Sequence, residues 1–139
     1  MESNAGQMAR PQKFRLIHLD THVVCWLYAG RTDLLSPPAQ EAIEQHALAV
    51  SPMVGLELQY LREIGRIRHG PKRVIAALRS ELGLSLSDLP FSAVAARAQS
   101  FSWTRDPFDR LIAAEAAVAR ARLVTRDDLL RRNFRLALW

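Results

Sequence analysis

Short apolar runs alternate along this chain with longer amphipathic segments. Four runs of four or five residues predict strands, because they are rich in branched apolar residues and end at polar or turn-forming residues. They are RLIHL (15–19), ALAVS (47–51), LSLS (84–87) and RLVT (122–125), and the C-terminal RLALW is a candidate edge strand. The segments between them have the length and apolar spacing of helices.

Capping and turn residues indicate where these helices begin and end. THVVCWLYAG predicts a short helix closed by Gly30, and Ser36 followed by two prolines predicts the start of a helix that runs to about His46. The same signals predict helices from Pro52 to about Gly65, Pro71 to Gly83, Pro90 to about Phe101 and Pro107 to about Ala121, with a helical turn at 127–132.

Strands alternating with helices predict an α/β fold, with a short parallel sheet of four to five strands flanked by helices. The chain has 139 residues, which is enough for one domain with its own core. We expect that domain to span residues 14–139, after a flexible polar tail at residues 1–13. In parallel sheets, functional sites lie beyond the carboxyl ends of the strands.

Four acidic residues are candidates for such a site. Asp20 directly follows the first strand, and Asp127 follows the fourth strand after two residues. Glu57 lies about two turns into the helix after the second strand, and Asp109 lies in the first turn of a later helix, so only tertiary structure can bring it to the same edge. Helical spacing puts Glu57 on or beside the apolar stripe formed by Val54, Leu58, Leu61 and Ile64.

Each acid taken singly has an ordinary structural interpretation. Asp20 and Asp127 stand at helix starts, Asp106 is a cap first and a metal-site residue second, and Asp109 suits the helix dipole. Glu57 could reach solvent or an arginine. Their joint placement favours a metal site instead, because gathered carboxylates raise each other's pKa values until a cation relieves the repulsion. Hard oxygen ligands of this kind suit Mg²⁺ or Mn²⁺.

The charge of the chain points to a nucleic-acid partner. The net charge is +5, and all but two of the nineteen cationic residues are arginine. Guanidinium forks match phosphate geometry, although biased codon use explains the composition almost as well. Arg62, Arg66 and Arg126 are the RNA-binding candidates. They belong to two groups, Arg62, Arg66, Arg68, Lys72 and Arg73, and Arg120, Arg122, Arg126, Arg131, Arg132 and Arg135, most of whose members we expect on solvated faces.

The remaining composition excludes several classes. The single cysteine, Cys25, leaves no intramolecular disulfide and no cysteine-based zinc site. No apolar run has the length of a membrane span, and the first residues lack the apolar core of a signal peptide. We therefore expect a cytoplasmic protein with no membrane partner. Trp26, Tyr28, Tyr60 and Trp103 could stack on bases or form a dimer face, but core packing is favoured for most of them.

Four segments in order resemble the PIN-domain ribonucleases, and in particular the VapC-type toxins of bacterial toxin–antitoxin pairs. They are LIHLDTHVVCWL, SPMVGLELQYL, RDPFDRLIAAEA and LVTRDD, and the run from Asp109 through Leu-Ile-Ala-Ala is the most specific. The resemblance implies that Asp20, Glu57, Asp109 and Asp127 are the four acids, with Asp128 as the fallback for the last. It covers the chain from about residue 15 to the end.

The resemblance also implies a Rossmann-like sheet, a homodimer, and hydrolysis of RNA phosphodiester bonds with Mg²⁺ or Mn²⁺. It implies a cognate antitoxin that wraps the toxin and blocks the acidic pocket. Gly55 and Leu56 depart from the family, in which polar or aromatic residues are common before the glutamate.

A bound divalent ion would lower the pKa of a water molecule that attacks phosphorus. Thr21 and Thr125 are placed to orient carboxylates or water, and simple capping explains them equally well. The alternative function is a non-catalytic RNA-binding or partner-binding module on the same fold. A phosphatase of the haloacid dehalogenase type is disfavoured, because it needs a second aspartate where His22 stands.

Overall fold

The computed structural model describes residues 15–139, so the predicted tail at residues 1–13 lies outside the described part of the chain. The strands are β1 (Leu16–Leu19), β2 (Ala47–Val50), β3 (Ser85–Leu86), β4 (Arg122–Val124) and β5 (Ala137–Leu138). The helices are α2 (Thr21–Tyr28), η1 (Thr32–Leu34), α3 (Pro37–Gln45), α4 (Pro52–Glu63), α5 (Pro71–Leu82), α6 (Phe91–Ala98), α7 (Pro107–Ala119) and α8 (Asp128–Asn133).

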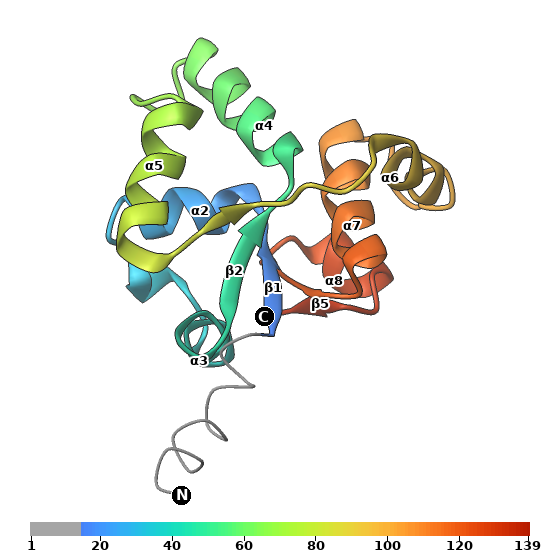
Figure 1. The fold of residues 1–139 in the computed structure, drawn as a ribbon, viewed down its shortest axis with the longest axis horizontal. Coiled ribbons are helices and arrows are strands. Elements are labelled where there is room, and N and C mark those ends of the chain that lie inside the picture. Colours follow the sequence, from blue (N-terminus) through green and yellow to red (C-terminus); the bar gives the residue numbers. More distant parts are fainter. Residues whose placement is uncertain (1–14) are drawn as a thin grey trace, which may run out of the picture.

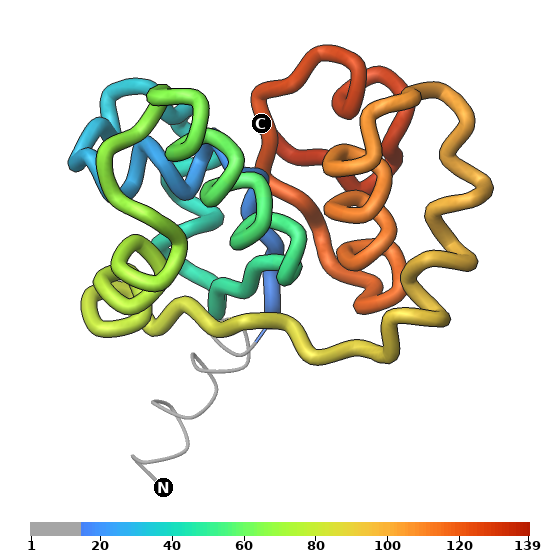
Figure 2. Tube along the Cα trace, turned by 90° about the horizontal axis from the view of Figure 1, so that it is seen from above, coloured from blue at the N-terminus to red at the C-terminus, as the bar shows by residue number. Residues whose placement is uncertain are grey.

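The five strands form one parallel sheet in the order β3-β2-β1-β4-β5 (Figure 1). The chain builds outward from β1 through β2 to β3 and then returns to the other side of β1 as β4 and β5. Strand order therefore reverses between β1 and β4, and a crevice is expected beyond their carboxyl ends. Figure 2 shows α2 to α5 on one side of β1 and α6 to α8 on the other. The predicted α/β fold is confirmed.

The core lies on the central strands and on the helices that cover them. Leu19, Leu48 and Val124 are buried in the middle of the sheet, and each such side chain stabilises the fold by about 1.5–3 kcal/mol relative to exposure. Helix α7 contributes the buried alanines Ala113 and Ala116, whose small side chains allow neighbouring helices to approach closely. Helix α7 accordingly packs against both α6 and α4.

The predicted capping signals act as expected. The Ser36 hydroxyl accepts a hydrogen bond from the Ala39 amide at 3.2 Å, and the Ser51 hydroxyl accepts one from the Met53 amide at 3.0 Å. Each cap is followed by proline in the first turn of its helix. Gly83 ends α5 at a φ of 71°, a left-handed conformation that glycine adopts without strain.

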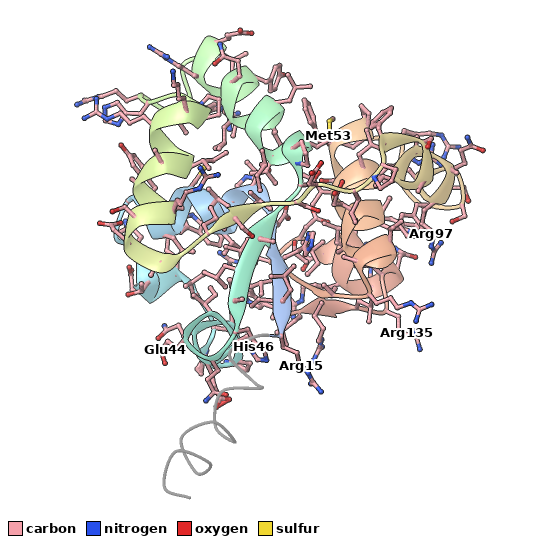
Figure 3. All side chains as sticks on the ribbon, in the orientation of Figure 1. Arg15, Glu44, His46, Met53, Arg97 and Arg135 are labelled. Atoms are coloured by element: carbon pink, nitrogen blue, oxygen red, sulfur yellow. The ribbon has the colours of Figure 1, made fainter. Side chains whose placement is uncertain are left out.

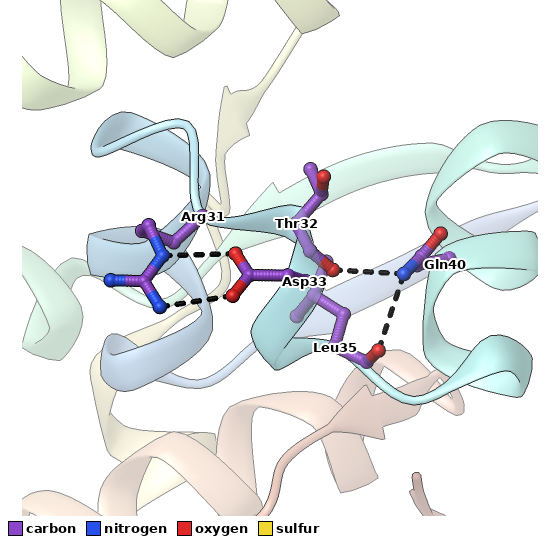
Figure 4. A network of polar contacts seen from close by, with 5 residues as sticks. All are labelled: Arg31, Thr32, Asp33, Leu35 and Gln40. Atoms are coloured by element: carbon purple, nitrogen blue, oxygen red, sulfur yellow. Dashed lines mark hydrogen bonds and ion pairs between the residues drawn. The ribbon is translucent and has the colours of Figure 1, made fainter.

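Two features differ from the sequence-based expectation. The 3₁₀ turn η1 was not predicted, because a turn of three residues has no apolar period. Gln40 ties it to α3 by donating to the carbonyls of Thr32 and Leu35, beside a two-bond ion pair between Arg31 and Asp33 (Figure 4).

Helix α6 was predicted to reach Phe101, but it ends at Ala98. The Ser100 hydroxyl donates to the Arg97 carbonyl at 2.8 Å, which is the local competition by which serine favours helix ends. Phe101 then turns inward and is only 6% exposed.

No helix in residues 15–139 combines the length and the apolar character needed to cross a bilayer.

His18 is a polar residue in the centre of the sheet. It lies on β1 opposite Ala49 of β2 and Leu123 of β4, and it is 1% exposed. Within residues 15–139, neither of its ring nitrogens has a hydrogen-bond partner. Burial lowers the pKa of His18 from 6.5 to about 4, because the charged imidazolium is costly in an apolar interior. The native state therefore holds a neutral histidine whose polar atoms are unsatisfied.

We expect His18→Leu to stabilise the protein and to flatten its acid sensitivity. An unpaired buried polar group costs about 1–3 kcal/mol, so the free energy of unfolding at pH 7 should rise by about that amount, less any packing strain. Between pH 6.5 and 4 the unfolded chain binds a proton that the native state rejects, so native stability falls as the pH drops through this window. The loss is about 3 kcal/mol in the unaltered protein.

Urea unfolding at several pH values measures both effects. His46→Leu is the control, because it removes a half-buried histidine that lies just before β2, outside the buried centre of the sheet. Equal pH dependence of His18→Leu and the unaltered protein would contradict this account.

Candidate metal centre

Asp20 is the most rigidly held of the predicted acids. Its amide donates to the Val124 carbonyl at 3.0 Å, so it extends the pairing of β1 with β4 by one residue. One carboxylate oxygen accepts from the Thr21 amide at 2.8 Å, and the other accepts from the Thr125 hydroxyl at 2.6 Å. The side chain is only 5% exposed. Adjacent strand ends thus fix this carboxylate at the point where strand order reverses.

Glu57 reaches the same place from α4. Its Oε1 accepts a hydrogen bond of 2.5 Å from the Thr21 hydroxyl. Thr21 therefore holds two acids at once, with its amide on Asp20 and its hydroxyl on Glu57. Both threonines proposed from the sequence contact the acidic group directly.

The apolar stripe of α4 is shorter than predicted. Val54 and Leu58 are fully buried, but Leu61 is half-buried and Ile64 is 50% exposed. The apolar positions thus become more exposed toward the last turn of the helix. Glu57 is half-buried beside the two buried positions, as its spacing predicted.

Asp109 lies in the first turn of α7, next to the cap that begins the helix. Asp106 is that cap, and it accepts hydrogen bonds from the amides of Phe108 and Asp109. The pKa of Asp109 is raised from 3.8 to about 7. Burial is the largest cause, and the further causes are the negative charges of Asp106, Asp20, Asp127 and Glu57. Five carboxyl groups from four separate segments thus act on one another.

Asp127 acts on the other acids, whereas Asp128, the alternative for the fourth acid, lines the neighbouring hollow. The charge of Asp127 raises the pKa values of Asp20 and Asp109, and its amide donates to the Thr125 hydroxyl at 3.1 Å. It also caps α8 by accepting from the Leu130 amide. Asp128 turns toward solvent and lies 3.7 Å from Arg131 of its own helix.

Burial and neighbouring charges disfavour the ionised form of these carboxyl groups, although hydrogen bonds favour it. Burial raises the pKa of Asp20, although its bonds from Thr125 and Thr21 oppose the rise. Burial also raises the pKa of Glu57 against the bond from Thr21, and the charges of Asp20 and Asp106 raise it further. Repulsion among ionised neighbours favours either protonation or a bound cation.

A hollow of about 450 Å³ opens beside Asp20 and Asp127. Its walls carry both signs of charge, since they consist of Asp20, His22, Trp26, Arg126, Asp127, Asp128 and Arg131. Carboxylates beside guanidinium groups suit a cation together with the phosphate that it binds. At the opposite end of the sheet lie Arg15, Glu44 and His46, far from this edge (Figure 3).

The donor set fits Mg²⁺ or Mn²⁺ by its chemistry, since it consists of carboxylate oxygens. In residues 15–139, no three histidine, cysteine or acidic side chains already surround one point closely enough to hold an ion. The carboxylates would have to draw together around the cation. Asp109 retains the capacity to do so, because no described residue donates a hydrogen bond to its carboxyl group.

The remaining candidates are divided between two places. Arg126 lines the acidic hollow, but Arg62 lies near the far end of α4, and Arg66 follows in the loop after that helix. Sequence reasoning gave His22 little weight, although its charge lowers the pKa values of both Asp20 and Glu57. Its position two residues after Asp20 was the available signal.

Comparison with known proteins identifies the family to which this chain belongs. Residues 17–134 match the sequence model of the PIN domain. Over 117 residues the chain is 38% identical to ribonuclease VapC22 of Mycobacterium tuberculosis, an alignment that covers 81% of this chain and 88% of that protein. The chain therefore belongs to the PIN-domain family. Within that family its sequence is VapC-like, as the four sequence segments predicted.

Solved structures share the fold. A toxin–antitoxin complex from Klebsiella pneumoniae matches with a TM-score of 0.61 at 19% identity, and VapBC2 from Rickettsia felis, bound to a DNA fragment from its promoter, matches with 0.58 at 18% identity. Each match covers 88% of this chain and 96% of the other. These similarities support the α/β arrangement described above.

We expect Asp109→Asn to stabilise the metal-free protein at neutral pH. The raised pKa means that Asp109 favours the native state below pH 3.8 and that this contribution is lost as the pH rises toward 7. Solvent screens part of the cost because the side chain is half-buried, so we expect a gain of about 2 kcal/mol or less.

Thermal unfolding in EDTA at pH 5 and pH 8 measures this effect, and the gain should appear mainly at pH 8. Asp128→Asn is the control, since the charge of the exposed Asp128 does not contribute to the raised pKa of Asp109. Equal gains from both substitutions would show that the effect is only a change in net charge.

Proposed function

We propose that this protein is a metal-dependent endoribonuclease that hydrolyses RNA phosphodiester bonds and acts as the toxin of a toxin–antitoxin pair. Mg²⁺ or Mn²⁺ would be held by Asp20, Glu57, Asp109 and Asp127. The supporting observation is the pKa of about 7 at Asp109, to which four other carboxyl groups contribute. Carboxyl groups gathered where the strand order reverses are well suited to bind a cation, because the cation relieves their mutual repulsion.

The chain's own residues supply orientation and phosphate binding. When bound, the cation would acidify a water molecule and stabilise charge on the phosphate. Thr21 and Thr125 hold the Asp20 carboxylate in one orientation on the wall of the hollow. Arg126, on the wall of the same hollow, is placed to bind a phosphate oxygen of the RNA strand.

We also propose a cognate antitoxin as the protein partner, a homodimeric assembly and a cytoplasmic location. The antitoxin proposal is supported by the VapC-like sequence and by the solved toxin–antitoxin complexes of the same fold. The mixed charge of the acidic hollow gives such a partner a site at which a basic side chain would compete with the cation.

One observation favours the alternative of a non-catalytic binding module. Asp20, Asp106 and Asp127 each accept hydrogen bonds from backbone amides at the start of a helix, so all three have a structural use. Capping does not explain the half-buried Glu57 and Asp109, whose carboxyl groups accept no backbone amide within residues 15–139. A cleavage assay separates the two functions.

We expect purified protein to cleave a mixture of structured RNAs with Mg²⁺ or Mn²⁺, and EDTA to abolish the cleavage. Asp20→Asn should lower the rate by about 100-fold or more, because several kcal/mol of transition-state stabilisation is lost with the cation. RNA affinity in EDTA should change by less than about threefold, since Asp20 does not bind phosphate directly. Glu44→Gln, at the opposite end of the sheet, is the matched control (Figure 3). Full activity in EDTA would contradict the metal dependence, and no cleavage with either metal would leave the binding module as the better interpretation.

RNA binding by Asp20→Asn should weaken steeply with salt. If arginines contact several phosphates, log K falls linearly with log salt concentration, and Arg126→Ala should reduce the slope by about one unit. Arg135→Ala is the comparison, because Arg135 projects from the surface beyond α8 (Figure 3). An affinity that barely changes between low and moderate salt would refute backbone contacts.

A further inference from the structure

A second hollow, outside the acidic centre, lies between α2, α4 and α5. Its volume is about 210 Å³, and its apolar walls are formed by Leu58, Ile67 and Val74. Tyr28 and His69 line it with a polar edge, because the tyrosine hydroxyl is 2.8 Å from His69 Nδ1 and the two rings meet edge to face. This hollow is a slot that is too small for a drug-sized ligand and has about the room of one planar ring.

A basic groove of about 540 Å³ adjoins the slot and shares His69 with it. Arg62, Lys72 and Arg73 line this groove, and its lining contains no acidic residue. Partial burial and then the charges of three arginines, Arg73, Arg68 and Arg62, lower the pKa of His69, so these cations converge on the junction. Across residues 15–139, none of the lining cations has a carboxylate within ion-pair distance.

The backbone beside the groove also favours a negatively charged ligand. Arg62 Nη1 lies 3.0 Å from the point that a Cβ on Gly70 would occupy, so a side chain there would crowd the guanidinium. Gly70 is also the N-cap of α5, and no side chain in the described part of the chain caps that helix. The guanidinium therefore lies beside free backbone amides, and both favour an anion.

Helix α2 connects the slot to the acidic centre. Thr21, Cys25 and Tyr28 are spaced by four and three residues, which puts them on one helical face. Thr21 binds the acids, and Cys25 and Tyr28 line the slot. Burial and the charges of Glu57 and Asp20 raise the pKa of Cys25 to about 11, which confirms that the acidic centre is near.

We propose that this face binds one nucleotide unit, with its base in the slot and its phosphate in the basic groove. Tyrosine, histidine and arginine are the side chains on which unstacked bases stack, and each such contact is worth about 1–3 kcal/mol. Arg62, Lys72 and Arg73 supply the charge for the phosphate. The unit is either a free nucleotide or an unpaired nucleotide of an RNA strand that continues along α2 to the acidic centre.

Binding is measured in EDTA with the Asp20→Asn protein, so that neither cleavage nor a bound cation contributes. The probes are AMP, UMP, pyrophosphate and a short single-stranded RNA. Ala29→Leu fills the rim of the slot from an exposed position, and the double substitution Lys72→Ala with Arg73→Ala removes two exposed cations. Arg79→Ala is the matched control, because it removes a cation from the other end of α5.

We expect both test variants to weaken nucleotide binding by about tenfold or more and the control to leave it within about twofold. Binding of AMP or UMP identifies a free nucleotide as the ligand, whereas binding of the RNA alone identifies an RNA segment. The proposal is overturned if pyrophosphate binds as tightly as AMP and Ala29→Leu has no effect, since the face would then be only a charged surface. It is also overturned if no probe binds to protein with normal thermal unfolding. RNA cleavage by the unaltered protein is scored separately, so failure here leaves the proposed nuclease activity standing.

Discussion

Repulsion among carboxyl groups at the junction of β1 and β4 is the constraint around which this domain is organised. The strands bring Asp20 beside Thr125. Thr21, Asp109 and Asp127 are added at the starts of α2, α7 and α8, and Glu57 is added from the second turn of α4. The fold tolerates this because hydrogen bonds from Thr21 and Thr125 offset part of the cost of burial, and Asp109 remains half-protonated near neutral pH without a cation. The reversal of strand order between β1 and β4, together with the helix caps, thus places several acids in one pocket, where their charges repel one another. Asp20 is held in place by its hydrogen bonds, so it would act as a fixed ligand of a cation. The carboxyl oxygens of Asp109 accept no hydrogen bond within residues 15–139, so Asp109 would act as an adaptable one.

The buried His18 and the half-buried Asp109 have opposite effects on how the stability of the metal-free protein depends on pH. Neutral His18 in the sheet favours high pH, because protonation in an apolar interior is costly. Asp109 favours low pH, because ionisation adds a negative charge to an already negative pocket. Only the second conflict has a natural remedy in a cation. His18 has no partner within residues 15–139, and no structural or chemical use for it is evident.

Most of the fold could be predicted from the sequence because its signals are local. Ser36, Ser51 and the prolines that follow them mark helix starts whether or not the tertiary structure is known. The 3₁₀ turn at 32–34 and the early end of α6 could not be predicted, since they depend on side-chain hydrogen bonds from Gln40 and Ser100. At the site, local sequence indicated Asp20 and Asp127, whereas Asp109 required the resemblance or the coordinates. Nothing local distinguishes a first-turn acid that serves the helix dipole from one that faces four other carboxyl groups.

Capping and chemistry are therefore not competing uses of these aspartates. Asp20, Asp106 and Asp127 each commit one carboxylate oxygen to helix amides, and this fixes where the carboxyl group points. A ligand whose position is set by the backbone needs no further ordering when an ion arrives, so the entropy cost of binding is lower. Helix α2 contributes residues to two neighbouring sites. Its first residue, Thr21, orients the acids, and its last turn supplies Tyr28 to an apolar slot beside a basic groove. One short helix thus joins a surface suited to cations and a surface suited to phosphates, which is the arrangement required to hold a polyanion against a metal-binding pocket.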